Sequence, residues 1–340
     1  MARVRRVALL CVLLAAGSGL GATAATTLRM SLPPVLEALP IAFAEAWGMF
    51  DEEGLSVDLV GITDNQERST ALLTGNLDAV MSDVTSAVLD YLTSRSVVVL
   101  ASAGSTPQTG ALRLGLVSHA GFGPADVDGL LATSQIVGVT YRTDEEYLLD
   151  QFFPANGAPR AWRSRYTYFG DMLQLAMWFG AKTLPVAVLL EPYYSYIATL
   201  LPVSGVPMQL IVLSDFSAFS ALPRVILFRE KFVEQHPDDA ATFLRVYDAA
   251  VELLNATPRD EIINVGLDVV LGLFFQGADK TLIQQQTLDA MSIPQFERPG
   301  PLAEEVFDSV TQWMADKGYL SGFPNRCPSL AEFTDFTLLP

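Results

Sequence analysis

The feature that most constrains the fold of this chain is a regular alternation of strand-like and helix-like segments. Between residues 28 and 102 the hydrophobic pattern predicts four strands, with helices beginning at Pro40 and covering residues 66–74 and 85–93. Gly75 directly follows the second of these helices, as is typical where a helix ends. This βαβ rhythm predicts an α/β fold in which helices cover a mostly parallel sheet.

A second α/β set follows the first, and the chain is mostly helical from residue 231 onward. A chain of 340 residues is too long for one simple core. We therefore expect lobe 1 to combine residues 25–113 with residues 220–340, and lobe 2 to be residues 114–219. Two linking segments would then form a hinge, and a ligand would bind in the cleft outside the carboxyl ends of the strands.

The first residues have the pattern of a secretory signal peptide. Arg3, Arg5 and Arg6 precede an apolar run over residues 7–16, and residues 22–24 read Ala-Thr-Ala, the form of a signal-peptidase site. We predict that residues 1–24 are a signal peptide and that the mature protein is periplasmic or secreted. An uncleaved membrane anchor is the alternative.

The composition of the mature chain argues against a nucleic-acid partner. Loss of three arginines changes the net charge from −17 to −17 − 3 = −20. So acidic a protein is a poor partner for nucleic acids or anionic lipids. Cys327 is the only cysteine left, which excludes an internal disulfide.

Two stretches resemble a known family of binding proteins. PIAFAEAWGMFDEEGLSVDLV (residues 40–60) and ERSTALLTGNLDAVMSD (residues 67–83) resemble the substrate-binding components of ABC importers for sulfonates, taurine, nitrate and aminopyrimidine precursors, a family that includes thiamine pyrimidine synthase-like proteins. LLEPYYSYIA (residues 189–198) and the helical segment 229–258 are similar more loosely. The resemblance implies a type II periplasmic binding protein fold, with two lobes and two crossing strands at the hinge. It also implies a monomer that uses no cofactor and delivers a ligand to a membrane permease.

Candidate ligand-binding residues of lobe 1 follow its predicted strands. Asp83, Val84 and Thr85 come after the third strand, where either Ser82 or Asp83 is also expected to cap the next helix, a contribution of about 1 kcal/mol. The free N–H groups of such a helix start form an anion site. Ser105 and Thr106 follow the fourth strand, although a simple turn before Pro107 also explains them. In the Pro-rich turn after the first strand, the candidates for lining the cleft are Leu36 and Glu37.

In lobe 2, Tyr141 and Arg142 lie between a predicted strand and the next helix. Thr143 and Glu146 fit a capping box at the start of that helix, which explains both structurally. Arg142 is either a bidentate partner for a carboxylate or sulfonate, or a solvated surface charge.

Glu191 ends a strand and is followed by Tyr193 and Tyr194. These residues would suit a planar, partly cationic heterocycle such as an aminopyrimidine, with ordinary packing as the alternative for each tyrosine. Asp215 lies near the return crossing, in a hinge, helix-cap or ligand-contacting role. The sequence thus leaves two ligand classes open: the heterocycle, and a sulfonate or carboxylate.

Enzyme and metal chemistry have little support in the sequence. His119 and His236 are far apart, and no metal-binding or nucleophile motif is present. The CCCFC motif of intracellular relatives that build a thiamine pyrimidine is also missing. We therefore expect a non-enzymatic solute-binding protein of an ABC importer. The alternative is a ligand-sensing periplasmic protein that signals to a membrane receptor.

Overall fold

The computed structural model describes residues 26–108, 112–158, 160–200, 208–219, 222–265, 267–275, 285–323 and 327–340. The predicted signal peptide lies outside the described residues. Within the described part, no helix is both long and apolar enough to cross a membrane.

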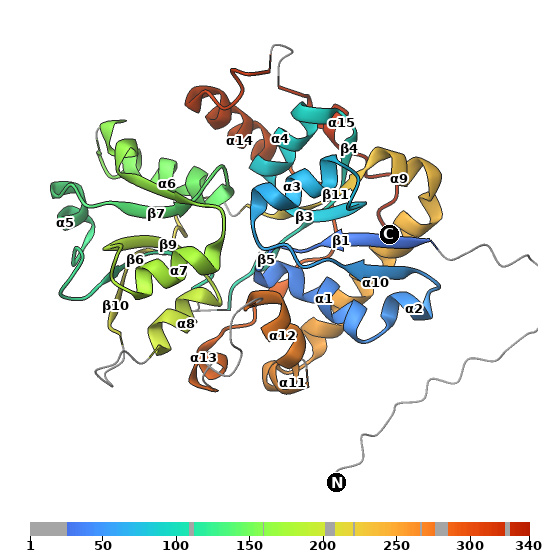
Figure 1. The fold of residues 1–340 in the computed structure, drawn as a ribbon, viewed down its shortest axis with the longest axis horizontal. Coiled ribbons are helices and arrows are strands. Elements are labelled where there is room, and N and C mark those ends of the chain that lie inside the picture. The colour runs from blue at the N-terminus through green and yellow to red at the C-terminus, as the bar shows by residue number, and fades with distance from the viewer. Residues whose placement is uncertain are drawn as a thin grey trace, which may run out of the picture.

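The first lobe is built on a five-stranded sheet with the order β2-β1-β3-β11-β4 (Figure 1). Its strands are β1 (Thr27–Ser31), β2 (Ser56–Leu59), β3 (Ala79–Asp83), β4 (Val97–Ala103) and β11 (Arg224–Arg229). β1 runs parallel to β2 and β3, whereas β11 is antiparallel to both of its neighbours. β3 is buried along its whole length, as expected for a central strand covered on both faces.

Helices from both ends of the chain cover this sheet. The N-terminal ones are the short 3₁₀ helix η1 (Leu36–Ala38), α1 (Leu39–Ala46), α2 (Met49–Glu52), α3 (Asn65–Leu73) and α4 (Val84–Ser94). The later ones are α9 (Glu230–Gln235), α10 (Pro237–Ala256), α11 (Arg259–Val265), α12 (Leu267–Phe274), α14 (Glu304–Lys317) and α15 (Leu330–Phe333). Between α12 and α14, α13 (Gln285–Ala290) packs instead on α8 (Tyr193–Thr199) of the second lobe. α10 packs on α1, and α14 packs on α4.

The second lobe, green in Figure 1, has a sheet of the order β10-β6-β9-β7-β8. Its strands are β6 (Leu114–His119), β7 (Val137–Thr140), β8 (Tyr166–Phe169), β9 (Val186–Leu190) and β10 (Leu210–Ser214). Its helices are α5 (Val127–Ala132), α6 (Asp144–Ala155), η2 (Arg160–Arg165), α7 (Met172–Gly180) and α8 (Tyr193–Thr199). The two sheets confirm the predicted two-lobed α/β fold.

Two segments connect the lobes. The chain leaves the first sheet after β4, passes through β5 (Ser105–Thr106), which pairs with β12 (Gln295–Phe296), and enters β6; it returns between β10 and β11. Arg113 joins both segments, because its Nη2 donates to the carbonyl oxygen of Leu222 at 2.9 Å while its Nε lies 3.3 Å from Oε1 of Glu37. The predicted lobe boundaries at residues 113/114 and 219/220 stay a prediction.

Candidate ligand-binding site

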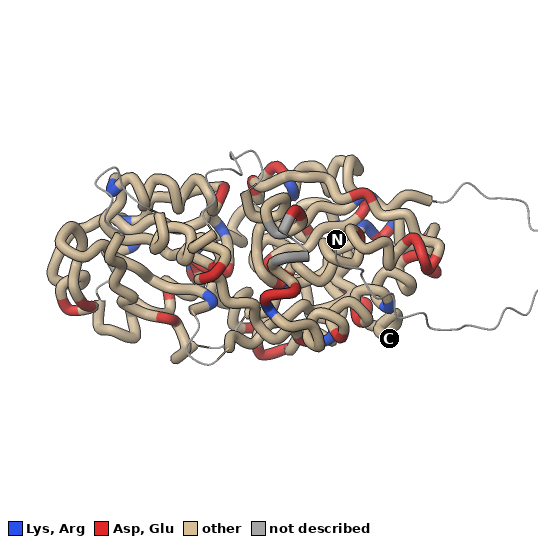
Figure 2. The backbone as a smooth tube through the Cα atoms, turned by 90° about the horizontal axis from the view of Figure 1, so that it is seen from below, with Lys and Arg blue, Asp and Glu red and all other residues tan. Residues whose placement is uncertain are grey.

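Charged residues gather where the two lobes meet (Figure 2). At this place the N-terminal ends of α4, from the first lobe, and α6, from the second, approach each other. Asp83 ends β3 and is the N-cap of α4, since its carboxylate accepts from the Ser86 backbone N–H at 2.8 Å and from the Ser86 hydroxyl at 2.9 Å. The predicted capping role of Asp83 is thereby confirmed.

Asp144, the first residue of α6, reaches across to the start of α4. Its carboxylate accepts from the backbone N–H groups of Val84 and Thr85, both at 3.3 Å, and from the Thr85 hydroxyl at 2.9 Å. Free N–H groups at a helix start are where an anion binds. Burial, together with the negative charge of Asp83, raises the pKa of Asp144 to about 7. A carboxylate of the second lobe therefore occupies the anion position of the first.

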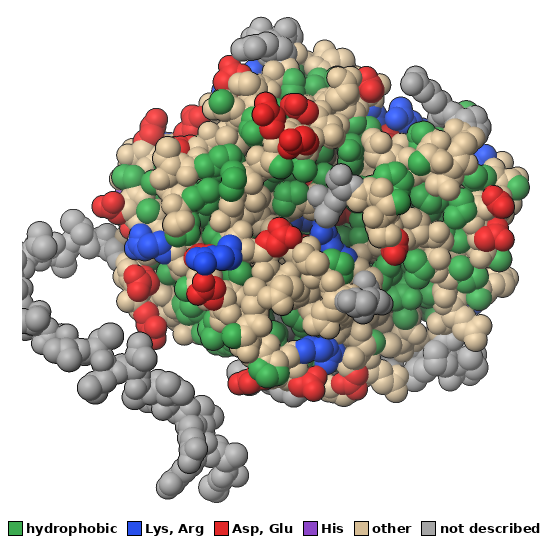
Figure 3. Space-filling model, turned by 180° about the vertical axis from the view of Figure 1, so that it is seen from behind, with side chains coloured by type: hydrophobic (Ala, Val, Ile, Leu, Met, Phe, Trp, Pro, Cys, Tyr) green, Lys and Arg blue, Asp and Glu red, His purple; other side chains and the backbone are tan. Residues whose placement is uncertain are grey.

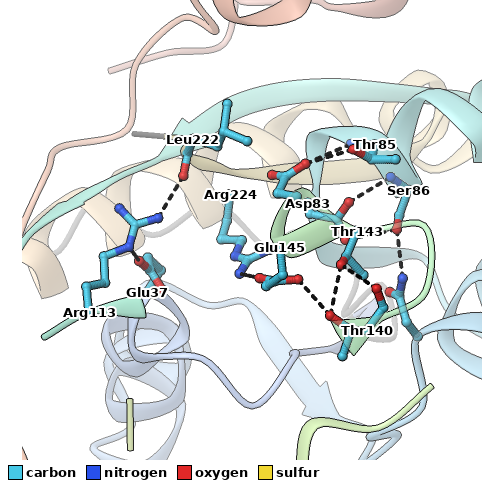
Figure 4. Close-up of polar contacts among 12 residues, drawn as sticks. Glu37, Asp83, Thr85, Ser86, Arg113, Thr140, Thr143, Glu145, Leu222 and Arg224 are labelled. Carbon is cyan, nitrogen blue, oxygen red and sulfur yellow. Dashed lines mark hydrogen bonds and ion pairs between the residues drawn. The ribbon is translucent and has the colours of Figure 1, made fainter. Parts of the chain in front are cut away.

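Arg224 lies beside Asp83 because of the register of β11. This strand is antiparallel, so it begins at the sheet edge where β3 ends, and Arg224 pairs directly with Asp83. Its Nη2 lies 2.6 Å from Oε1 of Glu145 in the second lobe (Figure 4). Its Nε, although buried, has no hydrogen-bond partner among the described residues.

The Arg224–Glu145 pair is stabilised by charge in a buried setting. Both side chains are less than a tenth exposed. Burial alone would raise the pKa of Glu145, but Arg224 outweighs it and leaves that pKa lowered. Burial likewise opposes the charge on Arg224, yet Glu145 and Glu37 keep the pKa of Arg224 above its ordinary value. The Thr140 hydroxyl completes the site by donating to Glu145 at 3.0 Å.

Two predicted residues meet near the hinge. The Ser105 hydroxyl donates to Oε1 of Glu37 at 2.7 Å. Arg113 contacts the same carboxylate, as Figure 4 shows. Glu37 is thus buried and paired. Burial on its own would raise the pKa of Glu37, but the positive charges of Arg113 and Arg224 outweigh burial and leave that pKa lowered. The arrangement ties the turn after β1 to both connecting segments.

A small pocket of about 50 Å³ remains between the lobes, and part of its wall is apolar, from Pro33, Pro34, Val35, Met172 and Leu190. We call it the polar pocket because charged side chains of both lobes line the rest. Its charged and polar lining comes from Thr63, Asn65, Arg68, Asp83, Thr140, Thr143, Glu145 and Arg224. An apolar pocket of about 250 Å³ adjoins it, shares Thr63 and is lined largely by residues such as Leu32, Leu59 and Leu273. The polar pocket is small because side chains of the two lobes contact each other directly across it.

A second set of contacts holds the lobes together farther from the hinge. Glu146 of α6 is fully buried and pairs with Lys317 at the end of α14, while the hydroxyls of Tyr168 and Tyr319 donate to it at 2.7 and 2.9 Å. Lys317 also lies 3.0 Å from Asp150. In addition, the indole N–H of Trp313 donates to Asp150 at 2.8 Å. We call Glu146, Asp150 and Lys317 the outer ion pairs.

Tyr141 and Arg142 lie between the start of α4 and the outer ion pairs: the Arg142 carbonyl oxygen accepts from Ser86, and its N–H donates to Glu146. The Arg142 guanidinium stacks over the rings of Tyr141 and Tyr319, with its Cζ 4.9 and 5.2 Å from their centroids. Neither Tyr141 nor Arg142 lines the polar pocket. The predicted capping box is wrong: the Thr143 hydroxyl bonds to Thr140, and Glu146 accepts from the Arg142 backbone N–H instead.

Glu191 and the tyrosines lie away from the polar pocket. The Glu191 carboxylate accepts from the backbone N–H and the hydroxyl of Ser195 at 3.2 and 2.7 Å, and burial raises the pKa of Glu191 to about 7. The Tyr193 hydroxyl, fully buried, donates to the carbonyl oxygen of Phe274 at 2.8 Å. Tyr194 packs half-buried against the core.

The other candidates also have local partners. Leu36 is a buried core residue. The Thr106 hydroxyl donates to Glu297 at 3.3 Å. Asp215 is exposed in the return segment and accepts from Ser217, which lowers its pKa. Ligand binding by the predicted residues stays a prediction; the structure brings together Glu37 with Ser105, and Asp83 with Val84 and Thr85.

Sequence reasoning missed three residues that lie at the centre of the site: Asp144, Glu145 and Arg224. The two acids lie between Thr143 and Glu146, the residues of the predicted capping box, and neither is singled out by the sequence. One sequence feature could have indicated Arg224: it is a single charged residue directly before the apolar run Val225–Phe228. Among the described residues, no group of three or more potential metal ligands is close enough to hold an ion.

Comparison with known proteins places this architecture among solved structures. No family model and no curated protein sequence matches the chain. A ligand-binding component of an ABC-type import system from Staphylococcus aureus, solved with zinc bound, superposes with a TM-score of 0.68 at 11% identity, covering 92% of this chain and 97% of that one. The chain has the periplasmic binding protein fold.

Two further solved structures agree with this assignment. The aliphatic sulphonate binding protein SsuA from Escherichia coli has a TM-score of 0.65 at 14% identity, over 91% of this chain and 97% of its own. The nitrate-binding protein NrtA from Synechocystis has 0.62 at 14% identity, over 93% and 87%. The fold of the suspected family is thus confirmed across nearly all of the chain. The polar pocket lies between the two lobes of this fold.

Proposed function

We propose that this protein is an extracytoplasmic solute-binding protein that delivers a small organic ligand to an ABC importer. The observation that carries the proposal is the buried polar pocket between two α/β lobes, with one wall from each. The wall of lobe 1 contains Arg224 and the start of α4, and that of lobe 2 contains Glu145 and the start of α6. Solved proteins of this fold include ligand-binding components of import systems.

Function would follow from movement of the lobes about the two connecting segments. Opening separates Asp144 from α4 and Glu145 from Arg224, and exposes both walls to solvent. A ligand bound to one wall then gains contacts with the other on closure, so it shifts the population towards the closed form. The Arg113 contacts with Glu37 and Leu222 lie beside the hinge and can persist during this motion.

The geometry favours an acidic group on the ligand over an aminopyrimidine-like heterocycle. Arg224 presents an unpartnered Nε at the pocket, and a guanidinium can hold a carboxylate or sulfonate through two parallel hydrogen bonds. The prediction of a heterocyclic ligand depended on Glu191, Tyr193 and Tyr194. Those side chains bond to Ser195 and Phe274, and none lines the pocket.

The exterior offers a basis for docking to a permease. Acidic side chains outnumber basic ones in the sequence and are spread over the face seen in Figure 3. We expect carboxylates on the lobes to meet basic patches of the membrane partner, with the binding protein acting as a monomer. Transport unchanged after exposed acids are replaced by Lys would remove this docking hypothesis.

Native mass spectrometry and uptake assays test the function together. Mature protein, residues 25–340, is purified from an expressing cell without denaturation, and the mass of any bound small molecule is measured. Cells lacking the gene are expected to lose high-affinity uptake of that molecule and to regain it with wild-type protein. Normal uptake combined with a lost ligand-induced response would support a sensor instead, and conversion of the bound molecule would indicate an enzyme.

A further inference from the structure

The two walls of the polar pocket have opposite charge. Lobe 1 supplies Arg224 and Arg68 to the pocket lining, against Asp83, whose carboxylate is already occupied by Ser86; the N–H groups at the start of α4 lie beside the lining, next to Asp83. Lobe 2 supplies Glu145 to the pocket lining and Asp144 beside it, and none of its described residues that line the pocket is basic. Without a ligand, these two carboxylates bond directly to the positive wall.

This contact places lobe 2 carboxylates where a ligand acid would bind. Asp144 accepts from Val84 and Thr85 at the helix start, and Glu145 accepts from Arg224. Two observations on lobe 1 mark an anion position independently of one another. One is the start of α4, and the other is the unpartnered Nε of Arg224, a side chain only 7% exposed. An acidic ligand group must therefore displace Asp144 and Glu145 from these donors.

The displaced carboxylates then need a partner of their own. A simple anion would close the lobes with Asp144 and Glu145 facing its negative charge, and a simple cation would leave Arg224 and the α4 start unpaired. Buried charges without partners are strongly unfavourable. A molecule with an acidic group at one end and a cationic group at the other pairs its acid with Arg224 and the α4 start, and its cation with Asp144 and Glu145.

We propose, on the basis of the function proposed above, that the ligand is a short zwitterion inserted between the two walls. Its carboxylate or sulfonate takes the position of Asp144 and Glu145 on Arg224 and the start of α4. Its ammonium group contacts the carboxylates of Asp144 and Glu145, which the acid of the ligand has displaced. Asp144 and Glu145 thus act twice, as internal substitutes for the ligand acid when the cleft is empty and as partners of the ligand cation when it is filled.

Isothermal titration calorimetry with matched probes tests the proposal. The zwitterions are glycine, 3-aminopropanoate, 4-aminobutanoate and 2-aminoethanesulfonate; each is paired with the acid lacking the amine and the amine lacking the acid. At least one zwitterion is expected to bind at least tenfold more tightly than both of its singly charged counterparts. A counterpart that binds as tightly as the best zwitterion would overturn the proposal, and so would a panel in which none binds.

A variant pair separates charge pairing from structural damage. Glu145→Gln, confirmed as folded by circular dichroism, is expected to bind the best zwitterion more weakly and the matched acid more tightly, which lowers their affinity ratio at least tenfold. Asp144→Asn should change the ratio in the same direction. The control Glu53→Gln removes an exposed carboxylate and should leave it unchanged. An unaltered ratio in both cleft variants would contradict the proposal. A co-purified ligand that is not zwitterionic would also refute it, while leaving the importer function intact.

Discussion

Lys317→Met tests how the lobes are held together without a ligand. Lys317 is the only cation that the described residues place on the fully buried Glu146, and its own side chain is 9% exposed. Removing one partner of a buried ion pair costs ~3–5 kcal/mol when the remaining charge stays buried. Here the cost has a limit, because opening the cleft lets water reach Glu146, which keeps its bonds to Tyr168 and to the Arg142 backbone within its own lobe.

The expected result is therefore a shift towards the open form. A change of ~3 kcal/mol alters the ratio of closed to open protein by a factor of about 150. Small-angle X-ray scattering should show a larger radius of gyration for the ligand-free variant, and urea unfolding should show a lower unfolding free energy. Lys231→Met, on the exposed face of α9, is the matched control and should match wild type in both assays. A Lys317→Met variant with wild-type radius of gyration and an unfolding free energy within ~0.5 kcal/mol of wild type would refute the reasoning.

Two further variants test single buried groups. Burial, opposed by the Ser69 hydrogen bond, raises the pKa of Asp90 to about 7, so the folded protein keeps a proton that the unfolded chain releases. Stability that Asp90 contributes at pH 4 is therefore lost as the pH rises to 7, by up to about 4 kcal/mol. Asp90→Asn should unfold at a higher urea concentration than wild type at pH 8, and its unfolding free energy should fall less between pH 4.5 and 7.5. Parallel curves of unfolding free energy against pH for the two proteins would contradict this. Tyr193→Phe removes the bond to Phe274, which joins α8 of the second lobe to α12 of the first, and should cost about 1 kcal/mol of unfolding free energy. Because the lost contact joins the two lobes, calorimetry should show a ligand affinity changed by less than about fivefold. A tenfold loss of affinity would instead support the ligand role predicted for Tyr193.

The sequence predicted those parts of the molecule that depend on local pattern. The segment β3–α4 is an example, because a buried strand, an N-cap at Asp83 and a helix follow one another within a few residues. Each signal lies in the chain itself, so periodicity and capping chemistry suffice to place the start of α4 at the edge of the sheet. Glu37 and Ser105 were each predicted as ligand contacts from their places after strands; the structure shows them bonded to each other, and ligand binding by them stays a prediction.

The centre of the site depends on contacts between distant segments. Arg224 is adjacent to Asp83 only because β11 lies antiparallel between β3 and β4. The order of strands in a sheet cannot be predicted from local sequence patterns. Asp144 and Glu145 lie inside a segment that was interpreted as a capping box of Thr143 and Glu146, and their contacts with the other lobe depend on residues far away in the sequence. For Glu191 the sequence leaves a buried, paired side chain and a cleft position both open, and the structure shows it buried with Ser195, four residues later, as its partner.

The central claim is that one ligand binds between the lobes on Arg224. Calorimetric titration of wild type, Arg224→Met and Arg224→Lys with the molecule that co-purifies with the wild-type protein tests it most directly. The account predicts a single site in wild type, affinity at least 100-fold weaker in Arg224→Met, and an intermediate value in Arg224→Lys, which keeps the charge but not the forked donors. Wild-type affinity in a folded Arg224→Met protein would contradict the account.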